Sequence, residues 1–175
     1  MTESLKCSCG GSLKSGILTR IDLAPIFGLH GWFEGHVRGV RCAECGVETL
    51  TGATYEQIRT EVARAVLTDV HILSGEQARF VRKAWLGLTQ EQLALRMGIN
   101  KITVADWERG ERPLSKEHDY ELRGIALSLL LGKRSTGRKG VAAAVVKEIE
   151  SVLMAPRLRG PQRTHRRYVI RARAA

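Results

Sequence analysis

Long hydrophobic segments and aromatic residues are both scarce in this sequence of 175 residues. The longest apolar stretch, residues 125–131, is far shorter than the roughly 18–20 residues that span a bilayer, so we expect no membrane segment. The first residues, Met-Thr-Glu-Ser-Leu-Lys-Cys, lack the apolar region of a secretory signal. We therefore expect the protein to be cytoplasmic.

Recognisable catalytic patterns are also missing. The sequence contains no Ser-His-Asp arrangement, no metal-binding pattern with an evident open position, and no paired carboxylates in a pocket motif. His118 and Asp119 are adjacent, but they fall at what reads as the polar start of a helix, where solvent is the expected partner. The sequence therefore predicts that the protein is not an enzyme.

The net charge of +10 comes from the carboxyl-terminal part of the chain. Residues 133–175 contain twelve Lys or Arg and two Glu, whereas residues 1–132 contain 16 side chains of each sign. Arginine-rich segments of this kind usually stay mobile and attract polyanions. We interpret the extension as an auxiliary nucleic-acid arm; the alternative is a solvated tail that aids solubility.

The chain has four cysteines, arranged in two closely spaced pairs. The pairs are Cys7-x-Cys9 and Cys42-x-x-Cys45, each followed directly by a glycine. In a reducing cytoplasm such pairs favour a structural Zn²⁺ site with four thiolate ligands over disulfides. The first pair is one residue shorter than usual, which leaves open that His30 or His36 replaces one sulfur. A redox dithiol is a further alternative, although no thioredoxin-like βαβ pattern surrounds either pair.

Two sequence regions precede the most informative one. Residues 1–52 are rich in glycine and contain short apolar runs, which favours brief strands joined by hairpins. Because so small a unit has few large apolar residues, it needs a cross-link such as a bound metal ion to fold alone. Residues 53–73 read as a connector helix, with Thr54 available as its cap, that packs on this unit or on a partner. Its apolar stripe consists of Tyr55, Ile58, Val62, Val66 and Val70.

Residues 88–110 read as a helix, a short turn and a second helix. Thr89 and Gln92 form a capping-box pattern, and Gly98 is a natural left-handed stop. Asn100 can cap the second helix, which Gly110 ends. A Ser74-x-x-Gln77 pattern starts an earlier helix, and two further helices are expected across residues 115–131.

The second helix of this pair has two distinct faces. Val104 and Trp107 lie three residues apart and face inward, whereas Ile102, Ala105 and Asp106 fall on the opposite side. An isoleucine and an alanine that face outward among polar neighbours indicate a contact surface. The pattern is typical of a helix that reads DNA.

These motifs resemble the lambda-repressor-like (Xre) family, whose hallmarks are Leu-Thr-Gln-x-x-Leu-Ala and Trp-Glu-x-Gly, here at residues 88–94 and 107–110.

A second resemblance lies in the order of the parts. Two cysteine pairs separated by 32 residues are followed by a connector helix and then by the helix-turn-helix motif, an order that is similar to the MqsA/YgiT-type antitoxin family. That resemblance covers about residues 5–131. It implies a zinc unit that holds a toxin and a helix-turn-helix that represses the shared operon. The implied zinc ligands are Cys7, Cys9, Cys42 and Cys45.

The expected fold class is therefore α+β. A zinc-ribbon-like β unit spans residues 1–52 and a connector helix spans residues 53–73. An all-α, five-helix lambda-repressor-like domain spans residues 74–132. A basic extension, residues 133–175, contains a helix at about 141–154.

Residue chemistry suggests how the outward face reads DNA. The family's two base-reading positions, an Asn and an Arg, fall on Ile102 and Asp106, so the operator sequence does not transfer from the resemblance. Lys101 can donate to guanine, and Ile102 can bury a thymine methyl group. Asp106 either accepts from cytosine or pairs with Arg109 within the helix. We expect base-reading by Lys101, Ile102, Ala105 and Asp106, and phosphate contacts by Gln90, Asn100, Thr103, Arg109 and Arg112.

Two structural expectations complete the interpretation. By the family's pattern, Glu108 pairs with a basic residue on the first helix, and Lys83 occupies that place. A single unit of this size covers too little DNA for high specificity, so we expect a homodimer that spans two half-sites. The helix at 141–154 is the candidate dimer contact, and residues 127–131 are the rival.

The sequence thus predicts a DNA-binding transcription regulator, with an antitoxin-like autorepressor favoured over a stand-alone regulator without a toxin. Its partners are operator DNA, a second copy of the chain and a toxin protein, and its cofactor is Zn²⁺. The alternative from another class is a zinc-ribbon interaction module that binds RNA or protein through the basic tail.

Overall fold

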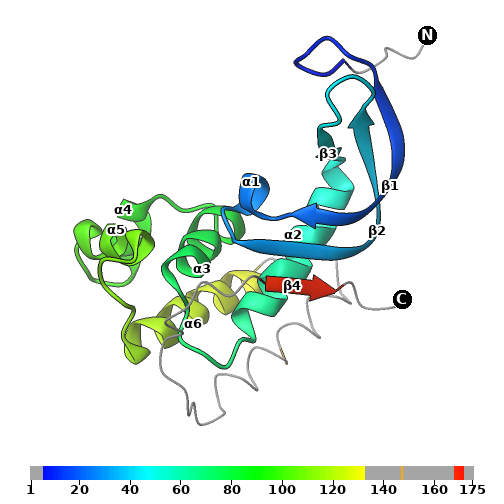
Figure 1. Cartoon of the computed structure of the whole chain (residues 1–175). Helices are drawn as coiled ribbons and strands as arrows, with labels where there is room; N and C mark the ends of the chain where they lie inside the picture. Colours follow the sequence, from blue (N-terminus) through cyan, green and yellow to red (C-terminus); the bar gives the residue numbers. More distant parts are fainter. Residues whose placement is uncertain (1–5, 133–146, 148–167, 172–175) are drawn as a thin grey trace.

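The amino-terminal part of the chain forms a long antiparallel hairpin in the computed structural model, which describes residues 6–132, 147 and 168–171. Strand β1 (Leu13–Asp22) pairs with β2 (Gly31–Cys42) along nearly its whole length. A four-residue helix, α1 (Ala24–Phe27), lies in the connection between them. The end of the hairpin that is remote from α1 projects away from the helices (Figure 1).

The expectation of brief strands is corrected, because β1 and β2 contain 10 and 12 residues. Several glycines that suggested turns lie inside the strands instead. Gly39 of β2 shows why a glycine is needed there: a Cβ at this position would collide with the side chain of Leu18 on β1. The glycine therefore makes room for a buried leucine and does not end a strand.

Two short strands complete the sheet along the second edge of β2. Strand β3 (Glu48–Leu50) pairs with it in antiparallel fashion, and β4 (Tyr168–Arg171) pairs with it in parallel. Ile170 of β4 is 5% exposed and belongs to the hydrophobic core. The expectation that the arginine-rich end stays mobile is therefore wrong for residues 168–171, because the buried Ile170 packs this segment onto the sheet.

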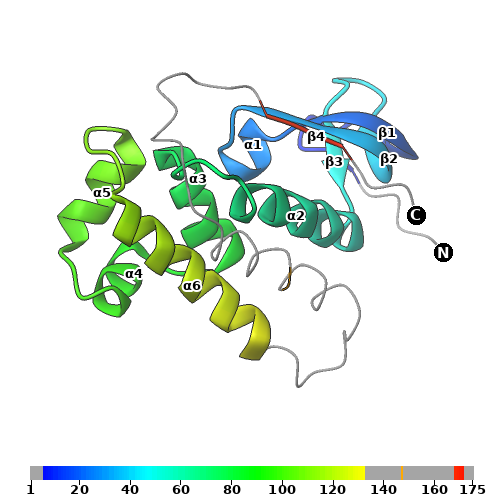
Figure 2. The same cartoon turned by 90° about the horizontal axis from the view of Figure 1, so that it is seen from below.

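Helix α2 (Gly52–Leu67) packs its apolar stripe against the sheet. Ile58 and Val62 are fully buried, and Tyr55 places its ring 5.3 Å from that of Phe27. Figure 2 shows α2 beneath the sheet, with α6 on its other side. Two details differ from expectation. The cap is Thr51, whose hydroxyl accepts from the Thr54 amide, and Val70 is exposed because the helix has already ended.

The helical domain follows directly. Helix α3 (Gly75–Phe80) continues into a π-helical turn, η1 (Val81–Trp85), and then come α4 (Gln90–Arg96), α5 (Lys101–Arg109) and α6 (Lys116–Gly132). Both predicted capping boxes are formed, at the starts of α3 and α4. Two helices were expected across residues 115–131, but a single helix, α6, covers this segment. The segment has no proline, and its one glycine, Gly124, lies inside the helix without interrupting it. The fold class is α+β, as predicted.

The sheet and the helices share a single hydrophobic core. One cluster of buried residues extends from Leu18 and Phe33 in the sheet, through α2, to Leu93 and Trp107 in the helical domain. The hairpin near α1 is therefore supported by packing rather than by a metal alone. Within the described part of the chain, no helix has the length and apolar character needed to cross a bilayer.

A buried ion pair within α6 ties this helix to the end of α2. Asp119 and Arg123 are both fully buried, with Nε and Oδ1 3.1 Å apart. The Arg123 guanidinium also donates to the backbone carbonyls of Val66 and Leu67, in the last turn of α2, and of His71 in the segment that follows it. The expectation that Asp119 faces solvent is wrong: the polar start of α6 packs against the end of α2, and Arg123 supplies the charge that Asp119 requires.

Candidate nucleic-acid interface and metal site

Helix α5 is anchored by its inner face and exposes its outer face. Val104 and Trp107 are 1% and 2% exposed, as the sequence predicted. The Asn100 side chain accepts a hydrogen bond from the Ile102 amide at 2.8 Å, which begins the helix, and Gly110 ends it with a left-handed φ of 75°. Helix α5 therefore has a defined start and end, and its buried face fixes its orientation in the domain.

The four predicted base-reading residues lie together on α5. Lys101 is exposed, and Ile102 is 65% exposed. Ala105 and Asp106 are half-buried on the following turn. The helix thus presents a cation, a methyl-rich side chain and a carboxylate within about one and a half turns, which are groups that match base edges in a major groove.

The Asp106 carboxylate has a partner within the helix. The Arg109 guanidinium donates from Nη2 to Asp106 Oδ1 at 2.5 Å, and from Nε and Nη2 to the two carboxylate oxygens of Glu111 at 2.7 and 2.8 Å. The hydrogen bond with Arg109 holds the pKa of Glu111 below its usual value. Of the two interpretations of Asp106, the intrahelical pair with Arg109 is the one formed in the free protein.

A second network lies behind the recognition helix. Glu108 receives hydrogen bonds from Nε and Nη2 of Arg82, at 2.5 and 2.9 Å, and from the Gln90 side-chain amide at 2.8 Å. The side chains of Arg82 and Glu108 are only 8% and 6% exposed. The predicted Lys83–Glu108 pair is therefore corrected to Arg82–Glu108: Arg82 faces α5, whereas Lys83 is one residue further round the helix and exposed.

The Arg82–Glu108 pair also positions the start of α4. Arg82 Nη1 donates to the carbonyl of Leu88 at 2.7 Å, directly before the α4 cap. Gln90, which we expect to contact phosphate, lies at the start of α4 and donates its side-chain N–H to Glu108. One buried pair therefore links three helices of the domain and places Gln90.

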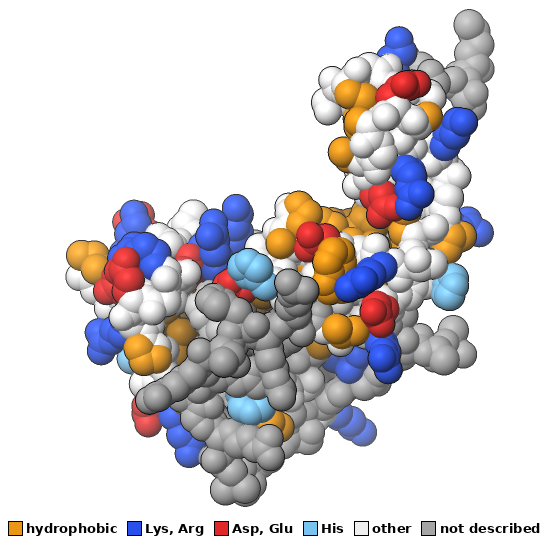
Figure 3. All heavy atoms as spheres, viewed as in Figure 1, with side chains coloured by type: hydrophobic (Ala, Val, Ile, Leu, Met, Phe, Trp, Pro, Cys, Tyr) orange, Lys and Arg blue, Asp and Glu red, His pale blue; other side chains and the backbone are white. Residues whose placement is uncertain are grey.

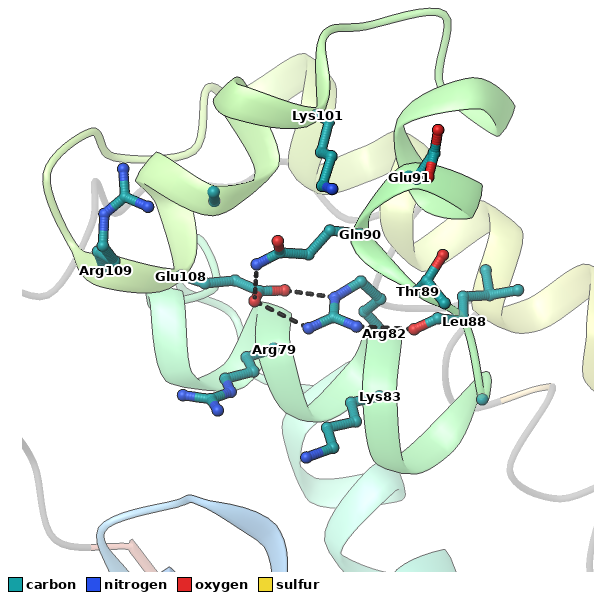
Figure 4. Close-up of a pocket in the computed structure, with 12 residues that line it drawn as sticks. Arg79, Arg82, Lys83, Leu88, Thr89, Gln90, Glu91, Lys101, Glu108 and Arg109 are labelled. Atoms are coloured by element: carbon teal, nitrogen blue, oxygen red, sulfur yellow. Dashed lines mark hydrogen bonds and ion pairs between the residues drawn. The ribbon is translucent and has the colours of Figure 1, made fainter.

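A hollow of about 750 Å³ opens between α3, α4 and α5 (Figure 4). Figure 4 shows Lys101 and Gln90 on its upper side, with Arg79 and Lys83 below them. The lining residues are Arg79, Arg82, Lys83, Gly87, Leu88, Thr89, Gln90, Glu91, Lys101, Ala105, Glu108 and Arg109. Sequence reasoning missed Arg79 as a member of this surface. Its spacing of three and four residues from Arg82 and Lys83, which places the three on neighbouring positions of a helix, was the available signal.

The remaining predicted phosphate contacts lie around this face. Thr103 is half-buried on α5, and Arg112 is exposed on the turn after Gly110. The Arg112 amide donates to the carbonyl of Asp106, so the turn is tied back onto the helix. Asn100 uses its side chain as the helix cap, which leaves it exposed beside Lys101.

The four cysteines meet at the projecting end of the hairpin. Their sulfur atoms all lie within 4.8 Å of one another. Cys7 and Cys45 are 3.6 Å apart, and Cys9 and Cys42 are 3.5 Å apart. Four thiolates bound tetrahedrally at ~2.3 Å from a zinc ion lie ~3.8 Å from one another, so this spacing fits a metal ion of that size. The arrangement can hold a metal with a complete set of sulfur ligands.

Backbone turns bring the sulfurs together. Gly10 and Gly46 follow the two pairs with left-handed φ angles of 89° and 72°. The Gly11 amide points at the Cys9 sulfur, with the nitrogen 3.4 Å from Sγ. A Cβ on Gly11 would collide with the Cys42 sulfur, so this position has no room for a larger residue.

The sulfurs strongly influence one another's ionisation. Hydrogen bonding from the Cys9 backbone amide, followed by the neighbouring thiols Cys9 and Cys45, lowers the pKa of Cys7 to about 6. The Val47 amide acts to lower the pKa of Cys45, but Cys9, Cys42 and Cys7 together raise it to about 12. The pKa of Cys42 is also lowered, first by hydrogen bonding from the Cys45 backbone amide, so the cluster favours thiolates at Cys7 and Cys42 and opposes one at Cys45. Four thiolates this close require a cation to compensate their charge.

The two candidate histidines lie apart from this cluster. His30 Nδ1 contacts Glu76 Oε1 at 2.5 Å, which ties the hairpin connection to the start of α3. His36 is exposed on β2. The dimer candidates are not described: residues 141–146 and 148–154 lie outside the described part, and of residues 127–131 only the Leu127 side chain is described, buried in the core.

Comparison with known proteins identifies one part of the chain. Residues 79–118 match the helix-turn-helix family model, which spans α3 to the start of α6. Neither curated proteins nor solved structures gave a match. The matched segment contains every predicted DNA-contacting residue. Residues 79–118 therefore form a helix-turn-helix, a domain found in DNA-binding transcription regulators.

Proposed function

We propose that this protein is a sequence-specific transcription regulator that binds operator DNA as a homodimer. The observation that carries the proposal is the outer face of α5, where Ile102 stays 65% exposed although the opposite face is fully buried. An exposed isoleucine at the start of a recognition helix is costly in water and useful against a thymine methyl group. Lys101, Ala105 and Asp106 complete the base-reading set.

Phosphate contacts surround this face in the proposal. Gln90, Asn100, Thr103, Arg109 and Arg112 lie on α4, α5 and the turns beside them, as the sequence suggested. Arg79 and Lys83 join them, because their side chains line the same hollow as Gln90 and Lys101. Contacts of this kind fix the protein's register on the duplex without selecting a sequence.

The cysteine cluster is proposed to hold a structural Zn²⁺ ion through Cys7, Cys9, Cys42 and Cys45. The support is the spacing of the sulfur atoms, the left-handed turns at Gly10 and Gly46, and the lack of room for a Cβ at Gly11. With four protein ligands the ion would have no open position for a substrate. It would instead clamp the projecting end of the hairpin, which is the part of the sheet furthest from the core.

We further propose an antitoxin-like autorepressor, whose zinc-bearing hairpin end binds a toxin protein. The support is the order of the elements, a cysteine-containing hairpin followed by α2 and a helix-turn-helix, together with the projection of the hairpin away from the DNA-reading helices (Figure 1). A partner on that end would leave α5 accessible. A stand-alone regulator without a toxin shares every other part of the proposal.

The test is a salt-titrated binding assay on the DNA upstream of the coding sequence, with scrambled DNA as control. The proposal expects a preference of about 10³-fold or more for the native sequence. That preference should disappear in the Ile102→Ala, Asp106→Ala double variant. Equal binding to both DNAs, weakened together by salt, would instead indicate binding through the basic extension. Copurification with the product of a neighbouring small gene tests the toxin partnership.

A further inference from the structure

The domain that reads DNA carries almost no net charge of its own. Residues 74–132 contain nine Lys or Arg and eight Asp or Glu. Figure 3 shows basic and acidic side chains intermingled on the visible face of the helical domain, without a single positive face. Duplex DNA attracts proteins mainly through its phosphates, so a nearly neutral reading domain has a weak general affinity for DNA.

One arginine at the end of the recognition helix is held by two acids. Arg109 lies between Asp106, three residues earlier, and Glu111, two residues later. Three of its five N–H donors are used by these carboxylates, in the forked geometry that is strongest for an arginine–carboxylate pair. The local charge of this group of three side chains is −1, which opposes a nearby phosphate.

The backbone explains why Glu111 reaches Arg109. Gly110 turns the chain with a left-handed φ of 75°, and the Glu111 amide donates to the Asp106 carbonyl at 3.0 Å. This turn folds residue 111 back alongside the last turn of α5. The hydrogen bond with Glu111 raises the pKa of Arg109, in keeping with a guanidinium held firmly in its charged form.

We propose that Glu111 is a specificity-determining residue that, with Asp106, withholds Arg109 from DNA phosphate until the correct bases are engaged. On a matching sequence, a base edge takes up the Asp106 carboxylate, which leaves Glu111 as the one acid of the group that competes with a DNA phosphate for Arg109. On other sequences Asp106 finds no donor, and Arg109 remains paired with both acids. The three residues therefore lower binding to generic DNA more than binding to the operator. This inference rests on the proposed DNA-binding function.

The test compares Glu111→Gln with Glu121→Gln, which removes another exposed acidic charge, on α6 and outside this group. Both are assayed on the DNA upstream of the coding sequence and on scrambled duplex across a range of salt. Glu111→Gln should bind scrambled DNA several-fold more tightly, with a salt slope steeper by up to ~0.9, because one more phosphate is neutralised. The ratio between the two DNAs should fall by a similar factor. Glu121→Gln should change both only slightly.

A second background separates Arg109 from a general charge effect. In Arg109→Met protein, the Glu111→Gln change should lose its effect on discrimination, since the side chain that it releases is absent. Sequence-specific binding with unaltered discrimination in Glu111→Gln, or an effect that persists in Arg109→Met, would overturn this inference alone. Absence of sequence preference in the unmodified protein would overturn the proposed function and this inference with it.

Discussion

Gly75, the first residue of α3, lies directly against the backbone carbonyl of Trp107 in α5. A Cβ at residue 75 would overlap that oxygen, and the next contacts are also backbone atoms, which cannot move aside as a side chain does. Helix α5 therefore packs against α3 in backbone contact at Gly75. This contact sets how closely α5 packs and so the orientation of its reading face.

Replacing this glycine should disturb both stability and binding. We expect Gly75→Ala to lower the free energy of unfolding by about 1–3 kcal/mol, the usual cost of overpacking. Urea unfolding measures it. Gly52→Ala is the control, because Gly52 begins α2 with nothing within 4 Å of an added Cβ. If the two variants had equal free energies of unfolding, the close contact between α3 and α5 at Gly75 would not be needed for stability.

The buried pair between Arg82 and Glu108 predicts a specific energetic coupling. Removing one partner leaves the other charge buried, so Arg82→Met and Glu108→Gln should each cost about 3–5 kcal/mol, whereas the double variant should cost less than their sum. Chemical denaturation of the four proteins in the cycle measures this. Lys83→Met is exposed and should stay within about 0.5 kcal/mol of the unmodified protein. Coupling of Glu108 to Lys83 instead of Arg82 would contradict the geometry.

The metal site should depend on the small size of residue 11. Gly11→Ala pushes a methyl group against the Cys42 sulfur and disturbs the amide that faces Cys9. Changes around metal ligands typically cost 10–100-fold in affinity, and we expect a loss of Zn²⁺ affinity in that range. Competition with a chromophoric chelator measures it. Gly16→Ala, which lies in β1 with nothing within 4 Å of an added Cβ, should bind zinc as the unmodified protein does.

Strand β4 should contribute to folding through one side chain. Ile170 is 5% exposed, whereas its neighbour Val169 is 52% exposed. Ile170→Ala should therefore lower the free energy of unfolding by about 2–5 kcal/mol, and Val169→Ala by far less. Thermal unfolding of both variants distinguishes them. Two equal, small effects would mean that residues 168–171 do not pair with β2 in solution.

Much of the helical domain was predictable because its signals are local. The capping boxes at Ser74 and Thr89, the Asn100 cap and the inward pair Val104 and Trp107 all follow from spacing within one or two turns. The cysteine cluster was also predictable, since closely spaced pairs that share one ion leave a pattern in the sequence. These features need no knowledge of distant contacts.

The errors concern partners that lie far apart in the sequence. Asp119 was assigned to solvent because its burial depends on distant contacts: Asp119 accepts from the Leu73 amide, and Arg123 donates to the Leu67 carbonyl at the end of α2. Lys83 was chosen over Arg82 because a family pattern gives the partner of Glu108 only to within one residue, and a shift of one residue turns a side chain by ~100°. The glycines of β2 suggested turns, since the role of Gly39 in accommodating Leu18 depends on the strand pairing itself.

The central claim, that α5 reads a defined DNA sequence, is tested most directly by selection from a random duplex library. The full-length, zinc-loaded protein is used at physiological salt, and the Ile102→Ala, Asp106→Ala double variant is run in parallel. We expect one enriched motif, formed by two inverted half-sites about one helical turn apart, which the double variant does not enrich. Recovery of unenriched sequences by the unmodified protein, or of the same motif by the variant, would contradict it.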